Sequence, residues 1–424
     1  MDKFTGVIGI IIILGIAYAM SNNRKKISLK TVINGLILQF LLGLFVLKVP
    51  LGQFIFKSLG AFIGKILDFA MEGANFIFGV LTSNPERMKE LFGSDPGILA
   101  FKLIPAIIFI MILTNILYYY GIMQKIVAIL SKAMYKIMNV SGAEALSNVS
   151  SGFVGQVVAQ IMIKPYLPNL TKSEILASMS GSMACIAAGM MAIYISIGIP
   201  AEYLLAATVM AAPGALVISK IVYPETEESE TKDSVKITVE KTAINVLDSI
   251  AQGAADGLKI SLNVLAMLVA LIALIGLVDW MIGGIGMFLT NIVGLGHIGL
   301  DLSDLSLKLI LGKLFSIFAV IMGVSIEHAD YVGQLLGTKF VLNETISYFD
   351  LAATSIQLPV KDYAIVVFAL CGFANVSSVA VQIGGIGEMI PHRRKDLAAL
   401  GGKALICGTL ASYVSAAMAG ILCG

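Results

Sequence analysis

The stretch CGFANVSS, residues 371–378, interrupts an otherwise apolar run that extends from residue 363 to residue 387. The run is long enough to cross a bilayer, since a spanning helix needs about 20 mostly apolar residues. Asn375 and two serines nevertheless stand near its middle. Backbone that leaves the helical form at membrane depth is tolerated only where protein or a water-filled cavity surrounds it. The stretch therefore predicts a broken membrane helix, and SMACIAAG at 182–189 predicts a second one within residues 175–201.

The composition places the whole chain in the membrane class. Hydrophobic residues make up 58% of the 424 positions and charged residues 13%, against about 25% charged residues in soluble domains. The 42 glycines are typical of closely packed transmembrane helices. The net charge of +2 gives no reason to expect a nucleic-acid partner, and the spacing of the four cysteines and three histidines indicates no metal site, disulfide or other cofactor. We therefore expect an all-α polytopic membrane protein.

Apolar runs of spanning length predict about eight transmembrane helices. These runs cover residues 4–23, 31–47, 103–124, 175–201, 203–219, 260–278, 363–387 and 404–424. The first run lacks a basic leader and a cleavage site, so we interpret it as a retained helix and not as a signal peptide. Three amphipathic segments, at 53–75, 122–138 and 243–259, are expected to be interfacial helices.

Lysine and arginine in the short loops predict the orientation, because positively charged loops stay in the cytoplasm. Basic clusters occur at residues 24–30, 125–136 and 393–403, and a single topology puts all three on the same side. Both termini then lie in the periplasm, and the protein is a multi-pass protein of a bacterial inner membrane. The mixed-charge segment 224–241 falls on the cytoplasmic side, where we expect a mobile linker.

Two further apolar segments are too polar to face lipid and predict re-entrant hairpins. The first lies near residues 144–168 and the second near residues 314–347. Each is followed by one of the broken helices and then by another span. The chain accordingly divides into an N-terminal scaffold of spans and an interfacial helix (1–100), a first repeat (101–242) and a second repeat (243–424).

The spacing within the two halves also recurs. Gln156 and Cys185 are 29 residues apart, and so are Glu344 and Phe373. The first hairpin enters from the cytoplasmic side in the predicted topology and the second from the periplasmic side. This is the inverted repeat of secondary transporters, which hold their solute near the midplane between broken helices.

The chain resembles the bacterial branch of the concentrative nucleoside transporter family over essentially its whole length. The most specific match is CGFANVSS, and the other matching motifs are SNNRKK at 21–26, FVGQ at 153–156, AAPG at 211–214, YPETE at 223–227, LNE at 342–344, GGIG at 384–387 and RR at 393–394. The resemblance implies eight spans, two hairpins, a homotrimer, and ion-coupled import of a nucleoside-like solute by an elevator motion.

The resemblance also implies roles for individual residues. Glu344, Asn375 and Ser378 match residues that hydrogen-bond the ribose hydroxyls, with Phe373 beside them against the nucleoside. A carboxylate can accept from two vicinal hydroxyls, while an amide and a hydroxyl both donate and accept. The alternative for Asn375 and Ser378 is that they only satisfy backbone groups freed by the helix break. Glu344 is harder to explain in that way, because an acid at membrane depth costs about 2.5–3.5 kcal/mol.

The first hairpin departs from the family pattern. The family usually reads GQTEAP where this chain reads GQVVAQ, at 155–160. Gln156 is kept, while Val157 and Val158 replace a hydroxyl and an acid expected near the nucleobase. Met190 replaces a smaller apolar residue near the same base. These changes predict an apolar, adaptable base site and a base preference unlike that of uridine carriers.

The residues at the expected ion site differ as well. Sodium-coupled members place Asn and Ser side chains where this chain has Ser151 and Cys185. A hard cation prefers oxygen ligands, so a thiol is a poor substitute. We therefore favour a proton over sodium as the coupling ion, with Glu344 as the ion-coupling acid and His328 in reserve. The neighbouring pair of Glu327 and His328 is otherwise interpreted as a solvated hairpin mouth.

Two other functions stay open at this point. A membrane-embedded enzyme acting on a lipid or nucleotide would need a catalytic motif, and the sequence shows no HExxH, no Ser/His/Asp set and no acidic metal cluster. A degenerate family member that binds its solute without transporting it is compatible with the altered first hairpin.

Overall fold

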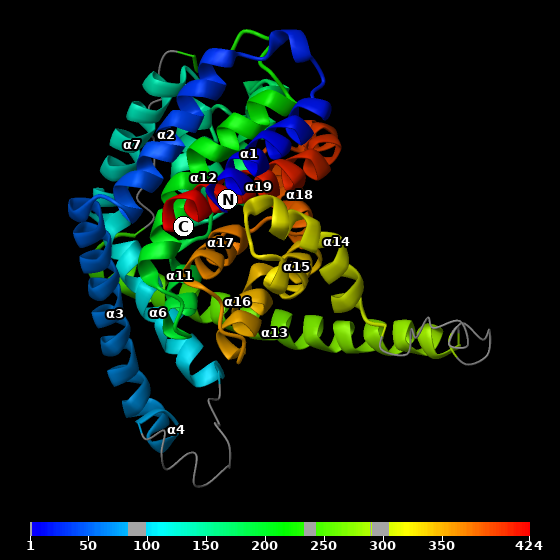
Figure 1. Cartoon of the computed structure of the whole chain (residues 1–424). Helices are drawn as coiled ribbons and strands as arrows, with labels where there is room; N and C mark the ends of the chain where they lie inside the picture. The colour runs from blue at the N-terminus through cyan, green and yellow to red at the C-terminus, as the bar shows by residue number, and fades with distance from the viewer. Residues whose placement is uncertain (1, 84–98, 233–242, 289, 291–304) are drawn as a thin grey trace.

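The computed structural model describes residues 2–83, 99–232, 243–288, 290 and 305–424, and every regular element within these ranges is a helix. Figure 1 shows the helices gathered into one body, with the N- and C-termini close together near its middle. The N-terminal elements are α1 (Asp2–Ala19), η1 (Arg24–Lys26), α2 (Leu29–Leu47), α3 (Pro50–Phe78) and α4 (Val80–Ser83).

The next part of the chain contains the first hairpin and the first broken helix. Its elements are α6 (Leu99–Tyr119), α7 (Ile122–Met138), α8 (Gly142–Val154), α9 (Val158–Ile161), η2 (Leu167–Asn169), α10 (Lys172–Ala184), α11 (Ala188–Ser196) and α12 (Ala201–Val222). The hairpin is formed by α8 and α9, and its second arm continues in turns rather than as a long helix. The broken helix is formed by α10 and α11, and α12 completes the unit.

The C-terminal part repeats this order of hairpin, broken helix and long helix. Its elements are α13 (Val246–Met287), α14 (Leu307–Met322), α15 (Ile326–Val341), α16 (Glu344–Ala353), α17 (Val360–Leu370), α18 (Val376–Met389), η5 (Pro391–Arg393) and α19 (Arg394–Cys423). Here α15 and α16 form the hairpin, α17 and α18 form the broken helix, and α19 completes the unit. Both predicted breaks are confirmed.

Two helix boundaries differ from those expected. The separate interfacial helix at 243–259 and span at 260–278 are one continuous helix, α13, of 42 residues. Gly253 and Gly257 allow this, because a Cβ at either position would lie within 2.7 Å of the α6 backbone, so that both parts pack along α6. The second hairpin occupies residues 326–353 rather than 314–347, since Gly323 ends α14 in a left-handed conformation, with φ of +101°.

The lengths and apolar character of the helices agree with a multi-pass membrane protein. In the described ranges, five helices are long and apolar enough to cross a membrane, and up to seven spans result if each of two bent helix pairs counts as one. The apolar α1 is shorter and packs against α19. Large apolar side chains, including Phe54 and Phe62 of α3 and Val269 of α13, face outward, as lipid-facing residues do.

The two hairpins enter from opposite ends of the molecule. The first begins beside the segment after α12, where the Gly142 amide donates to the Thr231 carbonyl over 2.8 Å. The second begins beside α1, where a Cβ at Gly323 would lie 3.8 Å from the backbone nitrogen of Gly6. The opposed arrangement of the hairpins is therefore confirmed.

The chain termini and the basic clusters that begin at Arg24 and end at Lys403 lie at opposite ends of α1 and α19. A Cβ at Gly6 would meet Ile421, so the N-terminal helix lies beside the C-terminal turn of α19. At the other end, the Asn22 amide donates to the Val222 carbonyl over 3.1 Å, and the Lys403 amine lies 5.7 Å from the centre of the Tyr223 ring. The predicted topology requires this arrangement, with the two termini on one side of the membrane and the basic loops on the other. The side of the membrane that each end faces stays a prediction.

Matching capping boxes begin α8 and α10. Ser141 and Glu144 bond reciprocally to one another's backbone amides at the start of α8, and Thr171 and Glu174 do the same at the start of α10. Each box satisfies two amide groups that a helix N-terminus otherwise leaves without a partner. Glu144 is buried and also forms an ion pair with the buried Lys220 of α12.

The segment after α12 is docked onto these capping boxes, although the sequence suggested a mobile linker at 224–241. Glu174 Oε1 accepts hydrogen bonds from the hydroxyls of Ser229 (2.5 Å) and Thr231 (2.9 Å). The Thr171 hydroxyl donates to Glu225 over 2.8 Å. Residues 223–232 thus form a strap across the starts of both helices, and residues 233–242 lie outside the described ranges.

The two broken helices cross at their breaks. The Phe373 amide donates to the Cys185 carbonyl over 3.3 Å, and the Ser412 hydroxyl donates to the Cys371 carbonyl over 2.9 Å. Gly372 makes this approach possible, since its φ is +133° and a Cβ there would lie 2.7 Å from the Ala184 carbonyl oxygen. Both the conformation and the contact require glycine.

We expect Gly372→Ala to lower the melting temperature of the purified protein. An unfavourable φ alone costs about 1–3 kcal/mol, and the contact with Ala184 adds to that cost. Gly402→Ala is the control, because Gly402 lies within α19 with open space around its Cα. If the Gly372→Ala protein had the same melting temperature as the wild type, the close crossing of the two broken helices would be contradicted.

Candidate functional site

Glu344 is the first residue of α16 and stands at the tip of the second hairpin. The preceding Asn343 caps the helix, and its side-chain oxygen accepts from the Ile346 amide over 3.0 Å. The position near a helix N-terminus is favourable for a negative charge. Glu344 is nevertheless only 2% exposed, so its carboxylate depends on hydrogen bonds from protein groups or from a ligand.

Three side chains donate to the Glu344 carboxylate. Tyr194 of α11 donates to Oε1 over 2.9 Å, and Thr345 donates to the same oxygen over 3.3 Å. The Asn375 amide, at the start of α18, donates to Oε2 over 3.3 Å. Donors from both broken helices therefore converge on one buried acid at a hairpin tip.

Asn375 has two roles at once. Its side-chain oxygen caps α18, accepting from the Ser378 amide over 2.9 Å and from the Ser377 hydroxyl over 2.7 Å. Its nitrogen faces Glu344. The capping interpretation of this residue is confirmed, while its contact with the ribose stays a prediction. Ser378 is buried beside it.

The tip of the first hairpin reaches the same helix, α18, farther along. Gln382 donates to the Gln156 side-chain oxygen over 3.4 Å and to the Met179 carbonyl over 3.2 Å. Val157 lies against Gly385, where a Cβ would come within 2.9 Å of it. Val158 is 45% exposed. The structure thus brings Gln156 and Val157 to α18 and leaves the Val158 side chain exposed.

The remaining residues expected to contact solute are partly exposed. Phe373 lies in the second break, and Met190 lies on α11 one helical turn before Tyr194. Tyr194 itself was not expected from the sequence, because a tyrosine in an apolar helix resembles a core residue. Its spacing of four residues from Met190 was the available signal, since such residues share a helix face.

Ser151 and Cys185 provide one hydroxyl oxygen and one thiol from their side chains. The Ser151 hydroxyl donates to the Ser147 carbonyl over 2.7 Å and shares a hydrogen bond of 2.9 Å with Ser182. Cys185 is buried at the first break, where its carbonyl accepts from Phe373. Within the described ranges, no group of three or more His, Cys, Asp or Glu side chains is arranged to hold a metal ion.

His328 lies at the opposite end of α15 from Glu344. Its Nδ1 is 2.8 Å from the Ser325 hydroxyl and 3.2 Å from the buried Asp362. The helix has 16 residues, so its two ends are about 24 Å apart. Glu327 is exposed at this end, as expected of a hairpin mouth, whereas His328 joins the starts of α15 and α17.

The chain matches three family descriptions in succession. Residues 8–81 match "Na+ dependent nucleoside transporter N-terminus", residues 100–201 match "Nucleoside recognition", and residues 203–420 match "Na+ dependent nucleoside transporter C-terminus".

Individual proteins are similar over the whole length. An uncharacterized transporter of Haemophilus influenzae is 38% identical over 430 residues, covering 100% of this chain and 99% of the relative. The nucleoside permease NupC of Helicobacter pylori is 36% identical over 423 residues, covering 99% and 97%. The structure of CNTnw in an inward-facing substrate-bound state superposes with a TM-score of 0.91 at 36% identity, covering 100% of both chains. These relatives include nucleoside transporters, and this chain belongs to the Na+-dependent nucleoside transporter family.

Proposed function

We propose that this protein is a symporter that imports nucleosides or related ribosides across the bacterial inner membrane. The observation that carries the proposal is the buried Glu344 at a hairpin tip, bonded to Tyr194 and Asn375 from the two broken helices. An ionised acid held by neutral donors at membrane depth is costly, and a solute with hydroxyl groups would provide further donors. Family membership supports the nucleoside class.

The ribose end of the solute is assigned to Glu344, Asn375 and Ser378, with Phe373 against the sugar or base. The base end is assigned to Gln156, Val157, Val158 and Met190. Asn375 and Gln382 support this division, since they contact the two hairpin tips and lie seven residues apart on α18. That separation is about 10 Å, which suits a solute with a polar group at each end.

The mechanism proposed is an elevator motion within a homotrimer. In this arrangement the hairpins and broken helices carry the solute, while residues 1–100 and α13 act as the scaffold. The exposure of α13 supports the assignment, because only 12% of an apolar 18-residue stretch of this helix is buried. Figure 1 shows α13 extending beyond the other helices. Its open apolar surface is available for lipid or for neighbouring subunits.

The coupling ion proposed is a proton rather than sodium. The family description names sodium, but Ser151 and Cys185 provide one hydroxyl and one thiol, and the hydroxyl is already bonded within the protein. A hard cation prefers several oxygen ligands. Glu344 is the buried acid that can accept a proton and also contact the solute.

Replacing Glu344 by glutamine should weaken solute binding by about tenfold or more, because a lost charged hydrogen bond costs about 1.5–3 kcal/mol. Binding to purified protein and uptake by proteoliposomes would be measured with a panel of ribonucleosides. Glu327→Gln is the control, since this acid is exposed at the far end of the same hairpin. Unchanged affinity in a folded Glu344→Gln protein would remove the ribose assignment.

The base preference should differ from that of uridine carriers. The apolar side chains of Val157 and Met190 cannot hydrogen-bond a pyrimidine, and a thioether adapts to larger surfaces. We expect a purine or modified riboside to be bound more tightly than uridine in a competition assay. The double variant Val157→Thr/Val158→Glu should move the preference toward uridine. A wild-type protein with uridine as its best solute would contradict this assignment.

An inward proton gradient at fixed sodium should stimulate uptake, whereas an inward sodium gradient at fixed pH should not. Both arms use wild-type protein in proteoliposomes with radiolabelled solute. The variant Ser151→Asn/Cys185→Ser restores the family's side chains and should gain sodium dependence. Sodium-driven accumulation by the wild type that survives a protonophore would overturn proton coupling.

A further inference from the structure

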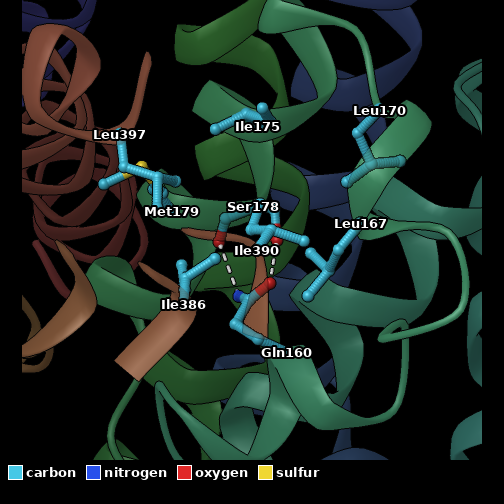
Figure 2. Close-up of a pocket in the computed structure, with 9 residues that line it drawn as sticks. All are labelled: Gln160, Leu167, Leu170, Ile175, Ser178, Met179, Ile386, Ile390 and Leu397. Carbon is cyan, nitrogen blue, oxygen red and sulfur yellow. Dashed lines mark hydrogen bonds between the residues drawn. The ribbon is translucent and has the colours of Figure 1, made fainter. Parts of the chain in front are cut away.

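A closed group of polar side chains joins the first hairpin to α10. Its members are Ser147 and Ser151 of α8, Gln160 of α9, and Ser178 and Ser182 of α10, and none is more than 2% exposed. Figure 2 shows Gln160 and Ser178 hydrogen-bonded on one side of a small pocket whose other lining residues are apolar. Five buried polar side chains at one seam need a full set of partners, since an unsatisfied buried group costs about 1–3 kcal/mol.

Gln160 is the centre of this group. Its amide nitrogen donates to the Ser182 hydroxyl over 2.8 Å and to the Ser147 hydroxyl over 3.1 Å. Its side-chain oxygen accepts from the Ser178 hydroxyl over 2.6 Å. The reverse orientation of the amide would turn both N–H groups toward the single Ser178 hydroxyl. In the orientation found here, both N–H groups and the carbonyl oxygen of the Gln160 amide are hydrogen-bonded.

The directions of the other hydrogen bonds follow from these. Ser178 gives its hydrogen to Gln160, so the 2.5 Å contact between Ser147 and Ser178 is a donation from Ser147. Ser151 gives its hydrogen to the Ser147 carbonyl, so the 2.9 Å contact between Ser151 and Ser182 is a donation from Ser182. Every hydroxyl and amide hydrogen in the group has an acceptor.

This arrangement is unfavourable for a cation. A hard cation needs oxygen lone pairs directed toward it, whereas here the two N–H groups of Gln160 point at the hydroxyl oxygens of Ser147 and Ser182. Ser182 is also the hydrogen-bond partner of the Ser151 hydroxyl. The second arm of the first hairpin contains only a short helix, because α9 has four residues, and Gln160 is one of the two that are buried. Gln160 is itself a departure from the family motif, which ends in proline at this position.

We propose that the Gln160 amide is a positioning group that fastens the first hairpin to α10 without a bound cation. The five side chains form a neutral network in which every hydrogen is bonded, and they do not fit a sodium ion. This role of Gln160 deepens the proposed proton coupling. Only the uptake measurement rests on that proposed function. Its main test, the stability of the purified protein, is independent of transport.

The test is the melting temperature of the full-length protein in detergent, titrated with sodium chloride against choline chloride. The wild type should show no sodium effect. Gln160→Met removes at least three hydrogen bonds and should melt about 2–5 °C lower, again without a sodium effect. Each bond contributes about 1 kcal/mol, and 1 kcal/mol corresponds to about 1 °C in a chain of 424 residues. Gln160→Glu puts an acid among the serines and should become stabilised by sodium or by lower pH.

Gln39 provides the matched control, because it is a buried glutamine that donates to a serine, Ser415, over 2.8 Å at another helix contact. Gln39→Glu and Gln39→Met should change stability without adding the sodium dependence that Gln160→Glu acquires. Hydrogen exchange of residues 142–161 should rise in Gln160→Met and stay unchanged in Gln39→Met.

Sodium stabilisation of the wild type, or unchanged exchange in a folded Gln160→Met protein, would overturn the proposal. Failure of nucleoside uptake with these stability results intact would instead count against the proposed transport function.

Discussion

The structure depends on one constraint, which is that backbone groups released by a broken helix must find partners where water is scarce. The two breaks provide partners for one another, through the bond from Phe373 to Cys185 and the approach of Gly372 to Ala184. Asn375 then caps the outgoing helix. Because these contacts hold both breaks at one point, the side chains beside them, including Glu344 and Tyr194, meet there as well.

Much of this architecture could be predicted from sequence. The polar interruptions near Cys185 and Phe373 located both breaks, and the equal spacing from Gln156 and Glu344 indicated the repeat. The joined length of α13 could not be predicted, because its amphipathic start and apolar continuation carry different local signals. What unites them is packing of Gly253 and Gly257 on α6, which is a tertiary contact.

A residue of the candidate site could be predicted where it is costly for its position. Glu344 is conspicuous as a buried acid, and the family resemblance supplied Asn375. Tyr194 and Gln160 were missed because a tyrosine or glutamine in an apolar segment has many ordinary explanations. Their contacts depend on the tertiary fold. Tyr194 hydrogen-bonds Glu344, which is 150 positions away in the sequence, and Gln160 hydrogen-bonds Ser182, which is 22 positions away.

The strap of residues 223–232 has a consequence for biosynthesis. It completes the starts of α8 and α10, yet it follows both of them in the chain, and Lys220, the ionic partner of Glu144, also comes later. While the chain leaves the ribosome, the first hairpin is therefore made before Lys220, which neutralises Glu144, and before the Thr231 carbonyl, which accepts from the Gly142 amide. The hairpin can reach its final state only after α12 has been inserted, so the order of synthesis and the order of assembly are different.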